Sequence, residues 1–340
     1  MHTESLRHRY LLRVVVPTLR LMGPRLTDRL ARMLGRAVFG LQTPARSVAE
    51  ERIRVGVAPD TATPSVASTC LAMYEQIGRF WAESVFLRRM QGRRCWSQRV
   101  AIDQRRRLEA LIQSSRGCIF TTPLFGNPAV AALSLGHLCR PIHVVADIPA
   151  MPRFDIWRRA LCPSPMIELV ARRDAARRLP DILGRGGSIF LLTADHRSSG
   201  LAVATEFLGR PIRCRPTPGR LAAWYDAPVV VVTCKRRPAA WRFTFDVHDV
   251  IDPRARSDGA SAITLRALRA AEKAIRAAPE QYLWALPGER PRTGGAVTDT
   301  EIESASYPRR NQTTMAWRRP SMAGRRRRGR AAATVHVPMA

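Results

Sequence analysis

The chain has 340 residues, of which 46% are hydrophobic, so it can bury a large core without disulfide or metal cross-links. Its formal net charge is +29, from 56 lysines and arginines against 27 acidic residues. This balance indicates an anionic partner: a nucleic acid, a membrane surface, or a phosphorylated or carrier-bound substrate. The seven cysteines never occur in a C-x-x-C spacing, which argues against a disulfide framework and a zinc site and favours a reducing compartment. We therefore expect neither a metal nor a cofactor.

Residues 1–41 are expected to form a basic amphipathic arm. No stretch of the chain approaches 18 uncharged apolar residues, so no membrane-spanning helix is predicted. Leucines and methionines recur at helical spacing between Leu19 and Leu34, with arginines at positions 20, 25, 29 and 32 between them. A helix of this kind lies in a membrane interface. It could equally dock on its own domain with a solvated basic face, and the pattern leaves both readings open.

Residues 42–290 are expected to form one α/β domain. The first part, up to residue 113, has helical periodicity, which is clearest in "STCLAMYEQIGRFWAESVFLRRM". From Gly117 onward, short β-branched runs alternate with helical stretches. Strands are predicted at 118–122, 142–147, 188–195, 228–234 and 241–250, and helices at 128–138, 152–161, 171–183, 216–226 and 258–279. This alternation predicts a mixed central sheet flanked by helices.

Residues 291–340 have no periodicity and are predicted to be a disordered basic tail. The tail holds ten arginines against three acidic residues, a net of +7, so +22 of the charge belongs to the rest of the chain. Its "RRRRGR" run could attract nucleic acid or anionic lipid. Because aromatic interleaving and a helix-turn-helix pattern are both missing, we expect no specific nucleic-acid partner.

One succession of short motifs carries a resemblance to a known family. In chain order these are "LFGN", "TADHRSSG", "TEFLGRPIR", "PTPGRLAAWYDAPVVVVTCKR" and "PEQYLW". Their order and spacing over roughly residues 5–290 resemble the lysophospholipid acyltransferase superfamily. The chain looks most like the late lipid A acyltransferases, the lauroyl and myristoyl transferases of lipopolysaccharide biosynthesis.

The resemblance implies a glycerolipid acyltransferase-like fold and an activity. Members of the family transfer a fatty acyl group from acyl carrier protein or coenzyme A to a hydroxyl of a membrane lipid. An acidic carrier protein and an anionic lipid A precursor both suit a basic surface. The implied location is peripheral, on the cytoplasmic face of the bacterial inner membrane.

The segment 117–138, which we call the reaction platform, departs from the family at the catalytic positions. The family pattern H-x-G-N-W-E supplies a histidine as general base and a carboxylate that orients it. When the pattern is aligned on Gly126 and Asn127, Leu124 stands at the histidine position and Ala129 at the acid position. Neither side chain can move a proton. The resemblance therefore implies a catalytic centre that is degenerate.

The remaining site candidates follow from the resemblance and mostly handle substrate. Asp195 and His196 are the only plausible replacement for the dyad, although the more common reading of such a histidine is a solvated loop residue. The predicted substrate-binding residues are Gly126, Asn127, Arg158, Arg159, Phe207, Gly209 and Arg210. Arginine suits a phosphate-bearing substrate because its planar fork binds phosphate oxygens in pairs. Cys118 has no adjacent histidine to activate it and is expected in the core.

Two functions remain open at this stage. The first is an acyltransferase with an impaired or altered catalytic centre. The second is a catalytically inactive pseudoenzyme that binds lipid or acyl carrier through the inherited groove.

Overall fold

The computed structural model describes residues 14–41, 43–57, 65–115, 117–139, 141–146, 165–192, 203–254 and 259–284. Its helices are α2 (Val16–Gly40), α3 (Pro44–Gly56), α4 (Val66–Ser84), η2 (Leu87–Gln91), α5 (Arg93–Arg99), α6 (Arg105–Ser114), α7 (Pro128–Leu138), α9 (Arg172–Gly184), α10 (Thr217–Tyr225), α11 (Ala260–Ala277) and η3 (Pro279–Gln281), where η marks a 3₁₀ helix. Its strands are β1 (Val100–Ile102), β2 (Ile119–Thr122), β3 (Ile142–Val145), β4 (Ile167–Val170), β5 (Ser188–Leu192), β6 (Val203–Phe207), β7 (Arg210–Cys214), β8 (Val229–Arg236) and β9 (Phe243–Ile251).

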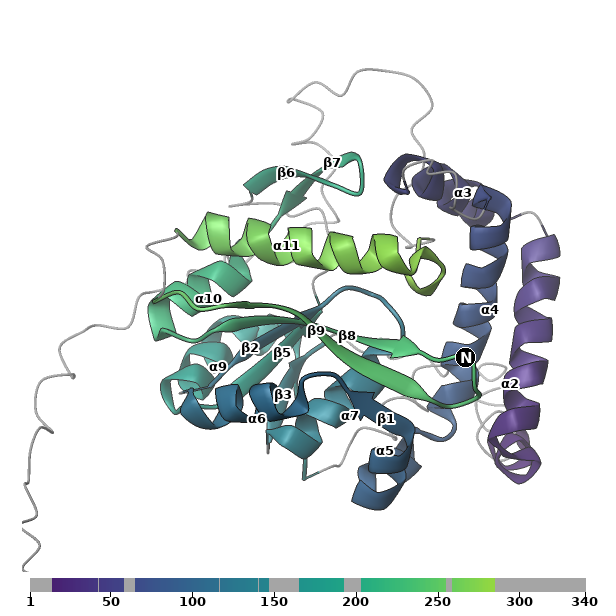
Figure 1. Cartoon of the computed structure of the whole chain (residues 1–340), viewed down its shortest axis with the longest axis horizontal. Coiled ribbons are helices and arrows are strands. Elements are labelled where there is room, and N and C mark those ends of the chain that lie inside the picture. The colour runs from purple at the N-terminus through teal and green to yellow at the C-terminus, as the bar shows by residue number, and fades with distance from the viewer. Residues whose placement is uncertain are drawn as a thin grey trace, which may run out of the picture.

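A mixed seven-stranded sheet forms the centre of the molecule, in the order β1-β9-β8-β2-β5-β3-β4 (Figure 1). Every neighbouring pair is parallel except β8 and β9, which form an antiparallel hairpin with a bulge between Val231 and Val232. Strand β2, the first element of the reaction platform, lies between β5 and β8. The predicted mixed α/β sheet is thus confirmed, and the platform starts from its middle.

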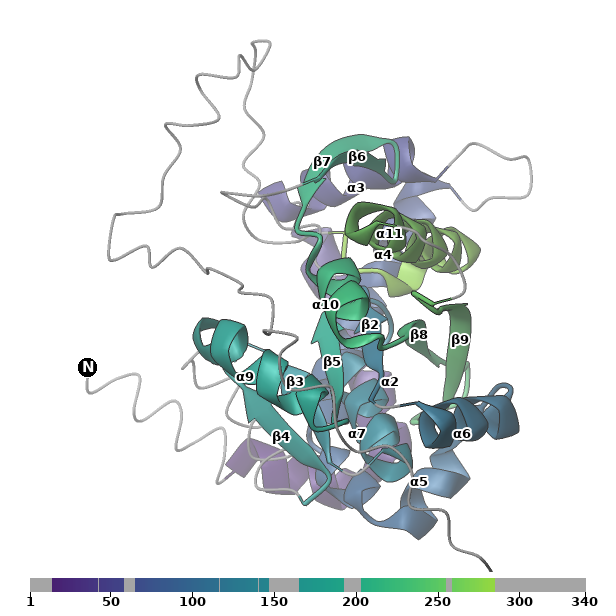
Figure 2. The ribbon, with the colours of Figure 1, turned by 90° about the vertical axis from the view of Figure 1, so that its left-hand side faces the viewer.

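Helices cover both faces of the sheet (Figure 2). Alternate side chains of the central strands pack into two different buried clusters. In β2, Phe120 joins a buried cluster with α7, whereas Ile119 joins a cluster with α9, α10 and α11. In β8, Val230 and Val231 divide between the same two clusters. Since both faces are covered, these strands are apolar without interruption, as parallel strands usually are.

The observed elements depart from the predicted ones mainly at short strands. The helices predicted at 128–138, 171–183, 216–226 and 258–279 are confirmed as α7, α9, α10 and α11. The five predicted strands are confirmed as β2, β3, β5, β8 and β9. Strands β1, β4, β6 and β7 were not predicted; β6 and β7 form a separate antiparallel hairpin. The helix predicted at 152–161 lies outside the described residues.

Helix α2 lies beside α4 (Figure 1). The two helices pack on each other through small residues. A side-chain carbon added at Gly78 would lie 2.2 Å from the carbonyl oxygen of Ala31, and one at Gly35 would lie 2.5 Å from that of Tyr74. The two backbones therefore approach as closely as helices do in small-residue packing motifs. Thus α2 is docked on the domain, as one of the two readings of the arm required.

Several large apolar side chains on α2 and directly after it are exposed, whereas Val16, Leu19 and Phe39 pack into the domain. We call Leu26, Leu30, Met33, Leu34 and Leu41 the apolar stripe. Three of them are highly exposed: Met33 at 62%, Leu34 at 64% and Leu41 at 71%. A row of exposed arginines, at positions 25, 29 and 36, runs beside the stripe. The exposed face of α2 is therefore apolar with a basic edge. A helix that only docked on its own domain was expected to expose a basic face without these apolar side chains. Among the described residues, no helix combines the length and apolarity needed to cross a bilayer.

Candidate active site

The reaction platform turns sharply between β2 and α7, at the carboxyl end of a central parallel strand, where open α/β sheets usually place their ligands. Gly126 has a φ of +57°, and a side-chain carbon there would lie 2.0 Å from the carbonyl oxygen of Cys234 on β8. Only glycine fits both conditions. The Gly126 N–H donates to the carbonyl of Gln281 at 2.9 Å, and the Asn127 N–H donates to that of Cys234 at 2.9 Å. Consequently the turn is fixed on two sides by backbone hydrogen bonds.

Asn127 begins helix α7 and is fully buried. Its Oδ1 accepts the N–H groups of Ala129 at 3.1 Å and Val130 at 3.2 Å, which caps the helix. Its Nδ2 donates to Oε2 of Glu83 at 2.7 Å. Both ends of the amide are therefore committed to holding the platform. A direct contact of Asn127 or Gly126 with substrate stays a prediction.

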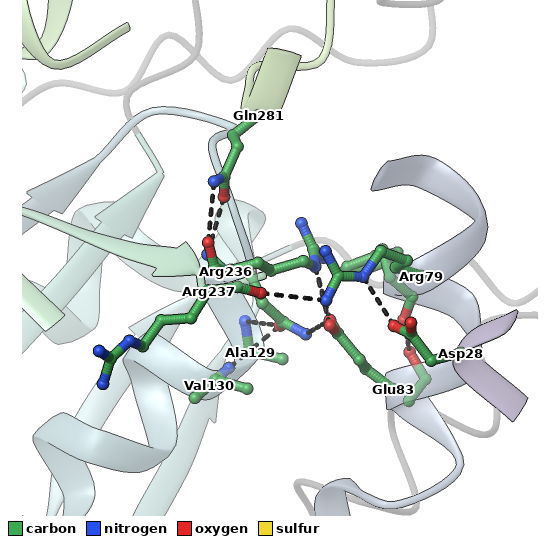
Figure 3. A network of polar contacts seen from close by, with 11 residues as sticks. Asp28, Arg79, Glu83, Ala129, Val130, Arg236, Arg237 and Gln281 are labelled. Atoms are coloured by element: carbon green, nitrogen blue, oxygen red, sulfur yellow. Dashed lines mark hydrogen bonds and ion pairs between the residues drawn. The ribbon is translucent and has the colours of Figure 1, made fainter. Parts of the chain in front are cut away.

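A buried network of charges lies behind the platform (Figure 3). Nε of Arg236 donates to both carboxylate oxygens of Glu83, at 2.8 and 2.9 Å. Arg79, one helical turn before Glu83, donates from Nε to Asp28 Oδ1 at 2.7 Å and from its guanidinium to the carbonyl of Arg237 at 3.2 Å. Burial raises the pKa of the Glu83 carboxyl, while the charge of Arg236 and the hydrogen bond from Asn127 act in the opposite direction. Two cations and two anions thus link α2, α4 and β8 to the start of α7.

Sequence reasoning missed this network. A weak signal was present, because Arg79 and Glu83 fall on the buried side of α4 together with Cys70 and Met73. Charged residues on the apolar side of a helix need partners. Nothing in the sequence identified Arg236 as that partner, since 153 positions separate it from Glu83.

The C-terminal segment "PEQYLW" holds the platform against β8. The amide of Gln281 accepts the Arg236 N–H at 2.7 Å and donates to the Arg236 carbonyl at 3.0 Å, as a neighbouring strand would. The Leu283 N–H donates to the carbonyl of Leu124 at 3.0 Å. The carbonyl of Trp284 accepts a 2.7 Å hydrogen bond from Arg52 of α3. The segment therefore ties together platform, sheet and the helical N-terminal part.

The two positions of the family dyad are occupied by packing residues. Leu124 is half-buried, and Ala129 is fully buried within the core cluster around α7. Cys118 is buried too, and burial raises the pKa of its thiol to about 11, which disfavours the thiolate that nucleophilic attack needs. His143 is a poor substitute base because Nδ1 lies 3.1 Å from the carbonyl of Ser188 and Nε2 lies 3.1 Å from a Glu168 carboxylate oxygen. Between Cys118 and Leu135, the part of the platform that includes the turn, there is no histidine or acidic side chain to accept a proton.

The other predicted site residues divide into two groups. Asp195, His196, Arg158 and Arg159 lie outside the described residues. Phe207, Gly209 and Arg210 form the turn of the β6–β7 hairpin, in which Phe207 pairs with Arg210.

The hairpin turn has a clear structural task. Phe207 is buried with Phe125 of the platform, Tyr282 and Trp284 in one apolar cluster. Gly209 has a φ of +72°, and a side-chain carbon there would lie 2.8 Å from the carbonyl of Val55 on α3. Phe207 and Gly209 are thus needed for packing. The phosphate-binding role of Arg210 stays a prediction.

Comparison with known protein families gives a match over most of the chain. A family model described as bacterial lipid A biosynthesis acyltransferase matches residues 2–287. No curated protein matches the chain. The family match covers the sheet, the reaction platform and the closing segment, and so spans every described element.

Proposed function

Because the chain belongs to the family of bacterial lipid A biosynthesis acyltransferases, we propose that it transfers a fatty acyl group to a lipid hydroxyl with an altered catalytic centre. The donor is acyl carrier protein or coenzyme A, and the acceptor is an anionic lipid resembling a lipid A precursor. The observation that carries this proposal is the platform: the glycine turn and asparagine cap persist in full at Gly126 and Asn127.

The altered centre uses His196, oriented by Asp195, as the replacement base. This role is supported by the position of the two residues in the sequence. Strand β5 ends at Leu192, which pairs with Thr122 of the platform, and Asp195 and His196 follow Leu192 shortly afterwards in the chain. Loss of a general base costs about 10²–10⁴-fold in rate, so turnover without any replacement would be slow but measurable.

The protein acts as a peripheral protein at the cytoplasmic face of the inner membrane. The apolar stripe of α2 inserts into the bilayer at the boundary between lipid headgroups and acyl chains, and the arginine row beside it contacts anionic headgroups. This placement brings the acceptor lipid to the protein. Flotation with vesicles tests it: replacing Met33 and Leu34 by glutamine should abolish binding, whereas replacing two exposed α6 residues, Arg106 and Arg107, by glutamine should retain it.

The decisive assay follows the release of carrier thiol from acyl carrier protein or coenzyme A in the presence of phosphorylated lipid acceptors. We expect activity that falls about 100-fold in His196→Ala, the size of a lost general base. The matched control is His248→Ala, on β9. Equal activity in the two variants would exclude His196 as the base.

A reconstructed dyad tests whether the groove is competent. Leu124→His with Ala129→Glu should raise thiol release by about 10²-fold or more. The control pair Leu124→Gln with Ala129→Gln has similar bulk and no proton chemistry, so its activity should not rise. Because Ala129 is fully buried, thermal unfolding must first establish that both double variants are folded. A folded histidine–glutamate variant without any gain would contradict an inherited working site.

The second candidate is a pseudoenzyme that binds lipid or acyl carrier. It is favoured by the burial of Ala129 and by the full commitment of Asn127 to holding the helix. A pseudoenzyme predicts stabilisation by acylated carrier or lipid with no thiol release above that of the His196→Ala variant.

A further inference from the structure

A second recess lies away from the platform, between the middle of α2 and the turn that joins β8 to β9. It has a cavity volume of about 520 Å³. Residues 22–25 form one wall, Ala239 and Ala240 of the turn form another, and Arg99 and Arg242 complete it. Figure 1 shows this end of the β8–β9 hairpin beside α2. We call it the kink pocket.

An interruption of α2 creates the kink pocket. Gly23 has a φ of +76° and a ψ of 169°, a conformation open only to glycine, and Pro24 follows it. No atom lies within 4 Å of the position where a Gly23 side chain would begin. The interruption is therefore not required to relieve a close contact at Gly23. Three basic side chains, Arg25, Arg99 and Arg242, line the recess beside this interruption.

Within the described part of the chain, the three arginines of the kink pocket have no carboxylate partner. Arg25 makes no hydrogen bond or ion pair with another described residue. The guanidinium carbon of Arg99 lies 5.2 Å from the centre of the Trp241 ring, and Arg242 donates to the carbonyl of Gln98. These contacts orient two of the guanidinium groups without neutralising them. Three like charges around one recess repel each other, so an anion that binds there relieves the repulsion.

The chemistry of the lining narrows the class of anion. Guanidinium groups match the tetrahedral oxygens of phosphate and donate to them in pairs. The pocket floor, from Ala239 and Ala240, is small and uncharged and so leaves room for the bound group. Leu26, the first residue of the apolar stripe, follows Arg25 directly, so a phosphate in the pocket would lie at the edge of the proposed membrane face.

We propose that the kink pocket binds a phosphate group, held by Arg25, Arg99 and Arg242. The phosphate comes either from a phospholipid headgroup or from a free phosphate ion. This site is separate from the reaction platform, and the proposal does not depend on acyl transfer.

Calorimetric titration of the full-length protein tests the proposal with two probes. One is inorganic phosphate, and the other is dihexanoyl phosphatidic acid below its micelle concentration. We expect Arg99→Gln with Arg242→Gln to weaken binding at least tenfold. The matched control, Arg106→Gln with Arg107→Gln on exposed positions of α6, removes the same charge and should weaken binding less than twofold.

The two probes identify the source of the phosphate. Tighter binding of the short-chain lipid assigns the pocket to a lipid headgroup, and equal binding of both probes assigns it to a free ion. Arg25→Gln breaks no contact of the described residues and so serves if the double variant fails to fold; it should weaken binding severalfold. Absence of binding to both probes at millimolar concentration overturns the proposal. So does equal weakening by the pocket variants and the α6 control.

Discussion

Replacement of Glu83 by leucine should destabilise the protein strongly, because it removes the counter-charge of Arg236. The side chain of Arg236 is 1% exposed and that of Glu83 is 5% exposed. Removing one partner of a buried ion pair costs about 3–5 kcal/mol. The variant also leaves Nδ2 of Asn127 without its 2.7 Å acceptor, a loss of about 1–3 kcal/mol for a buried donor. Since such losses are not additive, we expect the free energy of unfolding to fall by about 4 kcal/mol or more.

Urea unfolding followed by circular dichroism measures this loss as a shift of the midpoint at constant slope. The control is Glu109→Leu, which breaks the exposed pair with Arg105 and should cost less than about 1 kcal/mol. Glu83→Leu combined with Arg236→Met replaces both charges by apolar groups and should recover at least half of the loss. If the double variant is as unstable as the two single losses added together, the pair is not coupled and the reasoning is wrong.

Three further predictions concern the surroundings of the platform. Gly126→Ala should prevent stable folding or cost several kcal/mol, because its φ is positive and the added carbon meets a carbonyl at 2.0 Å; Gly259→Ala, which meets nothing within 4 Å, should have less than about 1 kcal/mol of effect in the same urea assay. Gln281→Ala should cost about 2 kcal/mol or more by leaving a buried N–H and carbonyl unpaired, and an undiminished midpoint would show that the amide clamp is dispensable. In the native protein at pH 8, Cys118 and Cys139 should resist thiol reagents, because burial raises the pKa of their thiols to about 11 and about 12; peptide mapping that found either labelled before unfolding would contradict this.

The sequence predicted the α/β architecture because its central strands are apolar runs that alternate with helical stretches. Apolar runs such as "PVVVVTC", followed by helical stretches, have few other interpretations. The strands that were missed lie outside the centre of the sheet: β1 and β4 are its two edges, and β6 and β7 form a separate hairpin. Strand β1 has three residues, and β4 is a four-residue strand at the sheet edge. Strands β6 and β7 have only five residues each and mix polar and apolar residues without strict alternation, so their sequences do not separate them from a loop.

The candidate site was predictable where it depends on local backbone and not where it depends on distant pairs. A glycine–asparagine turn before a helix is a local signal, and Gly126 and Asn127 have the conformations that it implies. The partners of that turn come from Glu83, Cys234 and Gln281, which no local pattern connects. Their identity follows from the packing of α4, β8 and the closing segment around α7.

The sequence left two interpretations of the arm open, membrane binding and docking on the domain, and the structure explains why. Helix α2 has three different faces, whereas an amphipathic pattern separates only an apolar face from a polar one. Its small residues contact α4, the residues of the apolar stripe are exposed, and the arginine row lies between these two faces. Small residues such as Ala31 and Gly35 contribute little to an apolar pattern, so the docking face was not visible in the sequence.

The closing segment has a consequence for how the protein is made. The Gly126 N–H, the backbone of Arg236 and the side chain of Arg52 all find partners among residues 281–284. A ribosome reaches those residues only after every strand of the sheet has been synthesised. Long-range contacts of this kind delay folding and leave partly built chains exposed. The turn at Gly126 therefore gains its full set of hydrogen bonds only after residues 281–284 have left the ribosome. A chain that ends before residue 281 lacks these partners.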